Sequence, residues 1–487
     1  MFNSIQRPKL LVAAIFIAGV VYFLFISLHD EFEDYIKVPY IFHGSPTTST
    51  TTAFVENAHT LPNADAYLPH FKAVTSLPNV TLVEAKAGCT WNDSEGVNFM
   101  YGGDADWVKN ERNESELAVK RNEWQDFINT KLIPYSRYSG RFSGRGIAVV
   151  AGNERTMKRV KVLLRSLQYL KCTLPIEIHF YGDEVPPATQ EEMLSLYPTM
   201  EIFFNDLASK SNIIKTGFNA FVANFQFKTA AVLNSRFAEV LLLDSDNIPA
   251  IDPALLFDSK TYLEYGTIFW PDIARTRPQN PIWAITNTVC KMDEYEQESG
   301  QLLVDKRRFF YHLQLAAWLN GENSSYYNKF LLGDKDMFRF TWHALKTAYG
   351  RPSRWLTSIG TLTEGKYCGH TFAQHFPDKG DDRIAFLHGG LLKQIPNEAV
   401  KWQREVNGGV YGQAYKRSPV DERQGEVQRC GMIWANGDYV PEEQKERELP
   451  VFSCIDMFGV EARPVGEVVE GFEKMFESVG GYWFLDD

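Results

Sequence analysis

From Gly146 onwards, short apolar runs alternate along the chain with longer segments whose apolar residues recur at helical spacing. The short runs predict buried strands, and the longer segments predict amphipathic helices. Strands that alternate with helices are typical of a mostly parallel, doubly wound sheet with flanking helices. We therefore predict one α/β domain over residues 146–487. Its predicted strands are 146–152, 176–181, 201–204 and 240–243, and the helices between them are 157–170, 190–196 and 219–237.

The strand predicted at 240–243 ends in a sharp change of polarity, because Val-Leu-Leu-Leu is followed by Asp-Ser-Asp-Asn at 244–247. Side chains alternate along an extended backbone, so Asp244 and Asp246 point to the same side. Ligands of open α/β sheets bind at the carboxyl ends of the strands, and hard divalent cations prefer oxygen ligands. The two acids therefore predict a metal site. An ordinary Asp/Asn-rich turn before Pro249 is the alternative.

Two further stretches place carboxylates next to apolar segments. In the first, Glu298 to Gln301 form a polar turn before a core strand at 302–304, and this turn either contacts sugar hydroxyls or only starts the strand. In the second, Asp334 and Asp336 precede an amphipathic helix. Asp334 either caps this helix or directs its carboxylate into a cleft.

An apolar strand predicted at 384–387 is followed by His388, two glycines and, five residues after the histidine, Lys393. A lone histidine is usually structural. Here, however, Gly390 and its neighbour permit close approach of the backbone to a bulky anion. A neutral imidazole can complete a metal site begun by the two acids, and Lys393 can neutralise a diphosphate. Lys228, in the helix before the acids, is either solvated or contacts a phosphate or ribose.

Residues 10–28 form a stretch of 19 residues without a charge. As a helix this stretch is about 28 Å long, enough to cross one hydrocarbon core. Arg7 and Lys9 precede it and four acids follow closely, so the positive-inside rule places residues 1–9 in the cytosol and the rest of the chain in the lumen. We predict a retained type II signal anchor, with a cleaved signal peptide as the alternative.

Composition predicts two regions between the anchor and the α/β domain. Residues 29–81 contain a Ser/Thr/Pro-rich run at 45–52 and are typical of an extended stem, whereas residues 82–145 predict a peripheral helical region. All six cysteines and four Asn-X-Ser/Thr sequons follow the anchor, which suits a secretory-pathway protein and allows up to three disulfides. The net charge of −11 argues against nucleic acid as a partner.

These motifs resemble those of the fungal Golgi α-mannosyltransferases, which extend N-glycans and cell-wall mannan with α-1,2- or α-1,3-linked mannose. The resemblance covers residues 146–393 and implies a GT-A type fold after a transmembrane anchor and stem. It rests on four motifs in the family's order, namely Leu-Asp-Ser-Asp-Asn at 243–247, Phe-Trp-Pro-Asp at 269–272, Glu-Ser-Gly-Gln at 298–301 and Gly-Asp-Lys-Asp at 333–336.

The resemblance implies that Asp244 and Asp246 bind Mn²⁺, or another divalent cation, and the diphosphate of the donor. The segment from His388 to Lys393 is also similar to the HxGxxK element of retaining GT-A enzymes of the glycogenin type, in which the histidine is a metal ligand and the lysine contacts diphosphate. That element continues with Pro-Trp, whereas Gln-Ile follows Lys393 here.

The remaining site residues are expectations that join the residue patterns to this resemblance. We expect a carboxylate near the anomeric carbon from Asp334, Asp336 or Glu298, and an apolar platform for a pyranose from Trp270. The residues expected to contact the donor, in addition to the two metal acids, are Lys228, Lys393, Gly390, Asp272 and Gln301.

The implied activity is retaining transfer of mannose from GDP-mannose to mannoside or glycoprotein acceptors at the Golgi membrane. The motifs favour α-1,2 over α-1,3 linkage, and homo- or hetero-oligomers with other glycosyltransferases are compatible with them. A same-fold enzyme that uses UDP-galactose or UDP-N-acetylglucosamine is an alternative, because acids that bind a metal and a diphosphate do not distinguish sugars. A catalytically silent, membrane-anchored glycan-binding subunit is the alternative of another class.

Overall fold

The computed structural model describes residues 55–90, 98, 101–219, 224–355, 357–363, 365–389, 395–417, 430–435, 452–457 and 459–485. The predicted cytosolic tail (1–9) and signal anchor (10–28) lie outside these ranges, as do Gly390 and Lys393. Every helix in the described ranges is too short or too polar to cross a bilayer.

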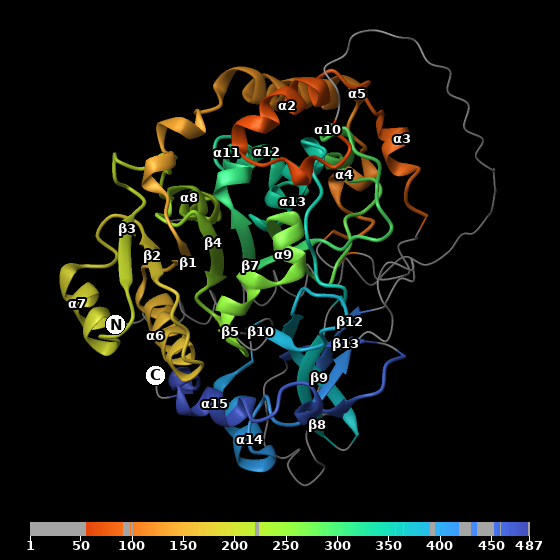
Figure 1. Ribbon diagram of the computed structural model, residues 1–487. Coiled ribbons are helices and arrows are strands. Elements are labelled where there is room, and N and C mark those ends of the chain that lie inside the picture. Colours follow the sequence, from red (N-terminus) through yellow and green to blue (C-terminus); the bar gives the residue numbers. More distant parts are fainter. Residues whose placement is uncertain are drawn as a thin grey trace, which may run out of the picture.

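A six-stranded sheet forms the centre of the molecule, with strand order β3-β2-β1-β4-β7-β6 (Figure 1). The first four strands in this order are parallel, whereas β7 is antiparallel to both of its neighbours. The sheet is therefore mixed and less parallel than the alternation of strands and helices predicted. The strands span Arg145–Val150 (β1), Ile176–Phe180 (β2), Ile202–Asp206 (β3), Glu239–Asp244 (β4), Thr267–Pro271 (β6) and Gln297–Asp305 (β7).

The apolar run of β4 explains how the sheet is covered on both faces. Val240 and Leu242 pack into a core with helices α8, α11 and α13, while Leu241 and Leu243 pack on the other face with α6 and α7. A strand buried on both faces reads as a continuous apolar run, as this one does. The helices span Glu154–Tyr169 (α6), Pro187–Leu196 (α7), Gln226–Asn234 (α8), Lys306–Asn320 (α11) and Lys335–Ala344 (α13).

Most predicted boundaries agree with the structure to within a few residues, and two do not. Helix α8 begins only at Gln226, although a helix was predicted from residue 219. The polar segment at 298–301 is not a turn, because β7 runs without a break from Gln297 to Asp305 and pairs Gln301 with Leu243 of β4. When a strand carries polar residues at one end, its sequence pattern predicts a turn at that end, because the sequence does not show which strand pairs with it.

The N-terminal segment lies across the outer side of α11 and α13 (Figure 1). Tyr67 of α2 (Tyr67–Thr75) is fully buried, and Trp124 of α5 (Glu114–Asp126) donates its indole N–H to the backbone of Ile285 at 2.8 Å. Residues 58–75 therefore fold into the main core, although a stem was predicted as far as residue 81. Shorter helices span Leu82–Lys86 (α3), Asp106–Lys109 (α4), Lys260–Tyr265 (α9), Ile282–Ile285 (α10) and Ser324–Tyr327 (α12).

Cysteine pairing stays within the limit of three disulfides that the count allowed. Cys89 and Cys290 form a disulfide that ties the N-terminal region to the loop before β7. Cys368 is also disulfide-bonded, whereas Cys172 is a buried free thiol. The six cysteines can therefore form at most two intramolecular disulfides.

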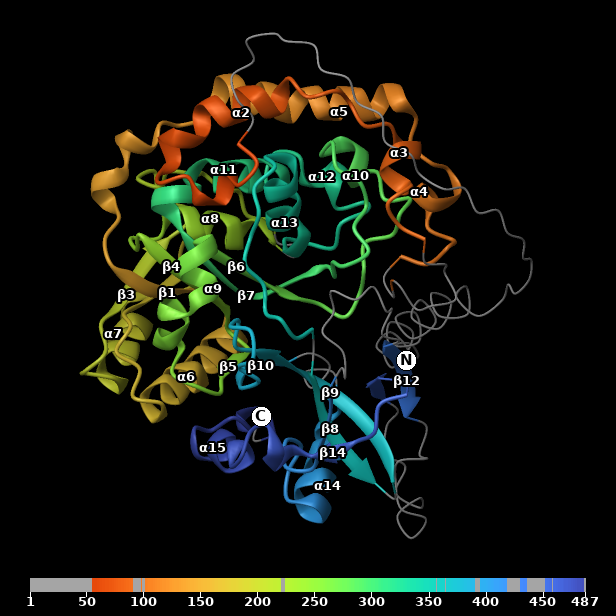
Figure 2. The ribbon, with the colours of Figure 1, turned by 45° about the vertical axis from the view of Figure 1, so that its right-hand side comes forward.

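A second, antiparallel sheet lies beside the first and carries the C-terminal part of the chain (Figure 2). Its strand β10 pairs with the short strand β5, which follows directly on β4, so the second sheet is attached at the edge where β4 ends. Its strands span Asn247–Pro249 (β5), Thr357–Thr363 (β8), Lys366–His375 (β9), Ile384–His388 (β10), Ala414–Arg417 (β11), Cys430–Ala435 (β12), Phe452–Met457 (β13) and Arg463–Pro464 (β14), and helices α14 (Asn397–Asn407) and α15 (Phe472–Ser478) lie beside it.

Candidate active site

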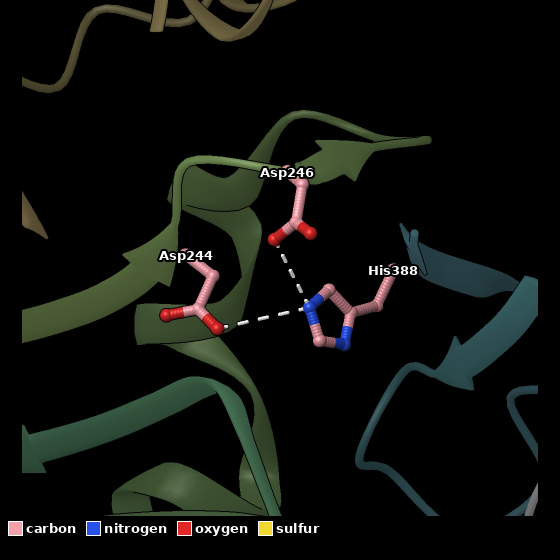
Figure 3. Close-up of side chains that lie close together, drawn as sticks. All are labelled: Asp244, Asp246 and His388. Atoms are coloured by element: carbon pink, nitrogen blue, oxygen red, sulfur yellow. Dashed lines mark hydrogen bonds and ion pairs between the residues drawn. The ribbon is translucent and has the colours of Figure 1, made fainter. Parts of the chain in front are cut away.

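Three side chains converge where β4 meets β5 and β10 (Figure 3). The imidazole Nε2 of His388 lies 3.3 Å from a carboxylate oxygen of Asp246 and 3.7 Å from one of Asp244. One ligand atom from each of the three residues lies within 4.8 Å of those of the other two. The structure therefore brings together the three residues that the sequence proposed as metal ligands.

Strand pairing explains this convergence. Asp244 ends β4 and Asp246 directly precedes β5, and the antiparallel register of β5 with β10 places Asn247 opposite His388. Asn247 is fully buried and donates its amide to the Gly300 carbonyl at 2.8 Å and to Gln301 Oε1 at 2.6 Å. The predicted turn is thus a short bend between two strands, fixed against β7. Gln301 supports this bend from a fully buried position rather than from the surface of a cleft.

Lys228 of α8 belongs to the same group and is not on a solvated helix face. Its Nζ lies 2.9 Å from Asp244, 3.2 Å from the hydroxyl of Ser299 and 3.3 Å from Asp334. Burial favours the neutral amine, but the carboxylates of Asp244 and Asp334 outweigh it and raise the pKa of Lys228 above its ordinary value. Lys228 therefore adds a fixed positive charge beside the acids.

Glu298 approaches His388 from the opposite side of the ring. Its carboxylate lies 3.4 Å from Nδ1, and its other oxygen accepts the backbone N–H of Gly300 at 2.8 Å. Burial acts to raise the pKa of Glu298, yet His388 and the Gly300 N–H lower it to about 2. Glu298 thus fixes the orientation of the ring so that Nε2 faces the two acids, an arrangement common around metal-ligating histidines.

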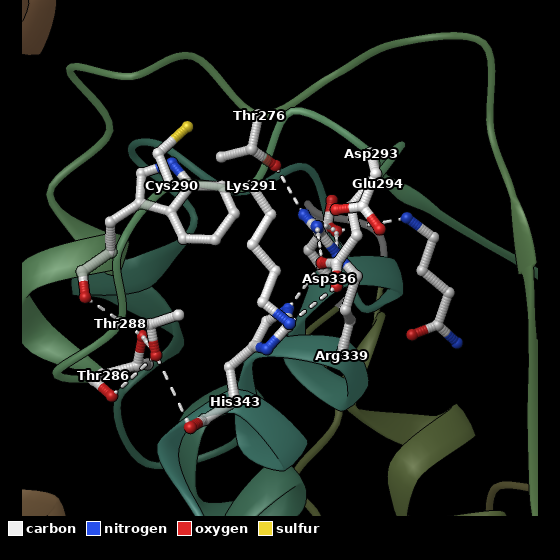
Figure 4. A network of polar contacts seen from close by, with 12 residues as sticks. Thr276, Thr286, Thr288, Cys290, Lys291, Asp293, Glu294, Asp336, Arg339 and His343 are labelled. Atoms are coloured by element: carbon white, nitrogen blue, oxygen red, sulfur yellow. Dashed lines mark hydrogen bonds and ion pairs between the residues drawn. The ribbon is translucent and has the colours of Figure 1, made fainter. Parts of the chain in front are cut away.

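The two acids of the Gly-Asp-Lys-Asp motif go to different places. Asp334 is buried beside Lys228 in the candidate site. Asp336 lies instead in a separate polar network, where it pairs with Arg339 at 2.8 Å (Figure 4). Glu294 joins the same network, 3.3 Å from Arg339 and 2.7 Å from His343. Residues two apart at the start of a helix point in different directions, which accounts for the separation.

The Phe-Trp-Pro-Asp motif ends strand β6, where Trp270 pairs with Glu298 of β7. Asp272 and Glu296 both pair with Lys335, the latter at 2.7 Å. Trp270 is 1% exposed and donates its indole N–H to the backbone of His375 at 2.8 Å. Trp270 therefore joins the two sheets as a core residue and does not offer a face to a sugar ring.

Arg159 is a member of the site that the sequence did not reveal. Its guanidinium lies 3.8 Å from the carboxylate of Asp246. Arginine within an amphipathic helix reads as a solvated residue, and only the grouping of Arg155, Lys158 and Arg159 on neighbouring turns of one helix could have indicated it.

The donor set suits a hard or borderline divalent cation. Two carboxylates and one imidazole nitrogen are ligands that Mn²⁺ accepts. A bound cation would also offset the repulsion between the two carboxylates, which lie close together. Lys228 lies beside Asp244, and Arg159 lies beside Asp246. An anion bound at the cation would therefore have a positive side chain near each of the two acids.

Comparison with known proteins gives the same reading of the chain. A family model described as "Mannosyltransferase putative" matches residues 144–294 and 284–376. Over this region the chain belongs to that mannosyltransferase family. The mannosyltransferase match includes both acids of the site and ends before β10 with its His388.

The curated relatives described here are fungal proteins. Alpha-1,2-mannosyltransferase MNN2 of Saccharomyces cerevisiae is 28% identical over 170 residues, which are 35% of this chain and 27% of the relative. Alpha-1,2-mannosyltransferase MNN23 of Candida albicans is 46% identical over 144 residues, 29% of this chain and 23% of the relative. MNN2 of C. albicans is 23% identical over 338 residues, and the alignment spans 55% of that relative. The chain thus matches about half or less of the length of these proteins.

Solved structures give weaker matches. The galactosyltransferase LgtC in complex with donor and acceptor sugar analogs has a TM-score of 0.30 and 15% identity, covering 40% of this chain and 69% of that one. The bifunctional glycosyltransferase WbbM has a TM-score of 0.31 and 11% identity, covering 42% of this chain and 38% of that one. Scores this low carry no argument about substrate or mechanism.

Proposed function

We propose that this protein is a divalent-metal-dependent, retaining α-mannosyltransferase of GT-A type that transfers mannose from GDP-mannose to a mannoside hydroxyl. The observation that carries the proposal is the convergence of Asp244, Asp246 and His388 at the end of β4, with ligand atoms within 4.8 Å of one another. The match of residues 144–376 to the mannosyltransferase family supports the sugar class.

Asp244, Asp246 and His388 would hold the cation, which, when bound, neutralises negative charge on the diphosphate leaving group. Glu298 keeps the His388 ring in place, 3.4 Å from its Nδ1. Lys228, and Lys393 outside the described ranges, supply positive charge to the same leaving group. With this stabilisation the departure of GDP leads the reaction, and no strongly basic nucleophile is needed.

The bond that breaks joins the mannose C1 to a phosphate oxygen, and the bond that forms joins C1 to the acceptor oxygen. The proton of the acceptor hydroxyl passes to the departing phosphate, so the products are GDP and the extended mannoside. Among the three carboxylates expected near C1, we assign this place to Asp334, because it lies 3.3 Å from Lys228 within the site. Glu298 is engaged with His388, and Asp336 with Arg339.

The relatives are named as α-1,2-mannosyltransferases, which favours an α-1,2 linkage for this chain as well. We further propose a type II topology, with residues 10–28 as the anchor and a Golgi-lumenal active site that acts on glycoprotein or mannan acceptors. A donor panel with UDP-galactose and UDP-N-acetylglucosamine tests the donor, because the acids do not distinguish sugars.

The decisive experiment measures transfer from GDP-mannose to α-mannobiose by the full-length protein in detergent, with linkage analysis of the product. We expect activity with Mn²⁺, loss in EDTA and loss in Asp244→Asn and Asp246→Asn. Asp126→Asn is the matched control, since the exposed Asp126 carboxylate pairs with Lys131 and accepts a hydrogen bond from the Thr130 hydroxyl, outside the site. Full activity of the Asp244 variant would refute the site. Glycan binding without turnover of any nucleotide sugar would favour the silent glycan-binding subunit.

A further inference from the structure

A pocket of about 350 Å³ opens next to Asp246, on the side of the site that faces helix α6. Its other boundary is formed by residues 479–485, which follow α15 and are called the C-terminal segment, together with the start of α14. Figure 2 shows α6 beside α15, with the main sheet above and the second sheet to one side. A volume of this size is at the lower end of the range for ligand pockets.

One wall of the pocket is basic. Arg155, Lys158 and Arg159 line it from the first turns of α6, and Arg159 reaches to 3.8 Å from Asp246. Three cations on one wall, next to two acids that suit a metal, form a path for a phosphate chain from the metal-type group into the pocket. A neutral mannoside would gain little from these charges, which favours the nucleotide over the acceptor as occupant.

The facing wall is aromatic and comes from the C-terminal segment. Trp483 and Phe484 line the pocket, and the Lys158 Nζ lies 5.5 Å from the centre of the Trp483 ring. Aromatic faces stack on nucleobases, and a neighbouring cation strengthens such a platform. The combination of a basic wall and an aromatic wall matches a nucleoside with phosphates attached.

This wall is built into the fold. Arg165 of α6 donates to the Val479 carbonyl at 3.3 Å, and Asn397 donates to the Phe484 carbonyl at 3.0 Å. The Tyr482 hydroxyl donates to Glu473 at 2.6 Å and accepts the Val410 N–H at 3.1 Å. The segment that carries Trp483 is therefore held from both sides of the pocket, so its ring is positioned before a ligand arrives.

We propose that this pocket binds the nucleoside part of the donor, with Trp483 and Phe484 as the platform for the base and Arg155 and Arg159 as phosphate contacts. The proposal rests on the proposed function, since it places the rest of a nucleotide whose diphosphate lies at Asp244 and Asp246. It assigns the C-terminal segment, which lies beyond the family match, a direct part in donor recognition.

The experiment measures binding by calorimetry with the full-length protein in detergent at a fixed Mn²⁺ concentration. The ligands are GDP, UDP and inorganic pyrophosphate, and the variants are Trp483→Ala, Trp483→Phe and Arg155→Gln. Lys161→Gln is the matched control on α6, because Lys161 pairs with Glu192 and does not line the pocket. Tyr169→Ala is the aromatic control, since Tyr169 is 60% exposed at the end of the same helix.

We expect Trp483→Ala to weaken GDP binding roughly tenfold or more and to leave pyrophosphate binding unchanged, while Trp483→Phe retains most of the GDP affinity. Arg155→Gln should weaken both ligands. Comparing two ligands on one variant separates a lost base contact from partial unfolding, which would reduce the binding stoichiometry of both.

Equal losses for GDP and pyrophosphate in Trp483→Ala, or no loss for GDP, would overturn the inference. A raised KM for mannoside with unchanged GDP affinity would do the same and would place the acceptor in the pocket. If the wild-type protein binds UDP in place of GDP, the donor assignment fails and the pocket is tested with UDP and the same variants. Pyrophosphate binding without binding of either nucleotide would refute the pocket assignment.

Discussion

Gly300 lies against the ring of His388 so closely that a Cβ atom at this position would come within 2.7 Å of the imidazole Cε1. Strand β7 thus offers the histidine a flat surface, and the backbone N–H of the same glycine holds Glu298 against the other ring nitrogen. The glycine in the Glu-Ser-Gly-Gln motif therefore has a steric reason. It leaves room for the ring to face the two acids.

Replacing Gly300 with alanine should displace His388 and weaken the metal site. We expect Gly300→Ala to lower affinity for Mn²⁺ by roughly 10–100-fold, as changes next to metal-ligating histidines do. The measurement is a Mn²⁺ titration of the apo-protein by calorimetry. Gly466→Ala is the control, because its added methyl group would meet nothing within 4 Å. Equal Mn²⁺ affinity in both variants would show that His388 is not a ligand.

Glu298→Gln distinguishes a positioning role from a catalytic one. Glu298 contacts Nδ1 of His388 at 3.4 Å, so its loss should reduce Mn²⁺ affinity roughly tenfold and leave kcat nearly unchanged once the metal is saturating. The assay records transferase activity over a range of Mn²⁺ concentrations. A fall in kcat that high Mn²⁺ does not restore would instead place Glu298 at the reacting sugar.

The two acids of the Gly-Asp-Lys-Asp motif should respond differently to the same isosteric change. Asp336 is buried and pairs with Arg339, so Asp336→Asn should lower the free energy of unfolding by about 3–5 kcal/mol. Asp334→Asn leaves Lys228 paired with Asp244, so it should cost less stability and reduce kcat by roughly 10²-fold. Urea unfolding and transferase kinetics on both variants test this, and matched stability losses with matched activities would contradict it.

Sequence patterns were enough to identify Asp244, Asp246 and His388 as one candidate metal site. They did not show which of the other motif residues belong to that site. The change from apolar to acidic residues marks the end of a buried strand, and the apolar run before His388 marks another. Their meeting depends on the pairing of β5 with β10, which hydrophobic periodicity does not encode. The direction of β7 is invisible for the same reason, since an apolar run reads alike in both directions.

Local pattern also leaves the position of single polar side chains undecided. Lys228 and Arg159 lie on helices, where charged residues are usually solvated, yet both face the acids because their helices pack beside the end of β4. Asp336 and Trp270 sit in motifs shared with the resembling family, but Asp336 pairs with Arg339 in a separate buried network and Trp270 packs in the core. Asp272 pairs with Lys335, and its contact with the donor stays a prediction. Motifs indicate which residues matter and not which of them share a site.

Protonation of His370 should make the second sheet sensitive to acid. His370 on β9 is buried, its Nε2 donates to the Val410 carbonyl at 2.7 Å, and its Nδ1 accepts from Thr371 at 2.8 Å. Burial lowers the pKa of His370 from 6.5 to about 4, although the hydrogen bond to Val410 opposes this. The unfolded chain therefore takes up a proton that the folded chain rejects between these two pH values.

His370 thus contributes about 3 kcal/mol to the free energy of unfolding. This contribution is present above about pH 6.5 and is lost as the pH falls towards 4. His375, whose pKa is also lowered to about 4, titrates in the same window, so the wild-type slope alone does not isolate one histidine. The test compares urea unfolding of wild type and His370→Gln from pH 7 to 4. The glutamine keeps a donor and an acceptor without titrating. Between pH 7 and 4 the free energy of unfolding of the variant should therefore fall by about 3 kcal/mol less than that of the wild type. Parallel curves would show that His370 does not titrate on unfolding.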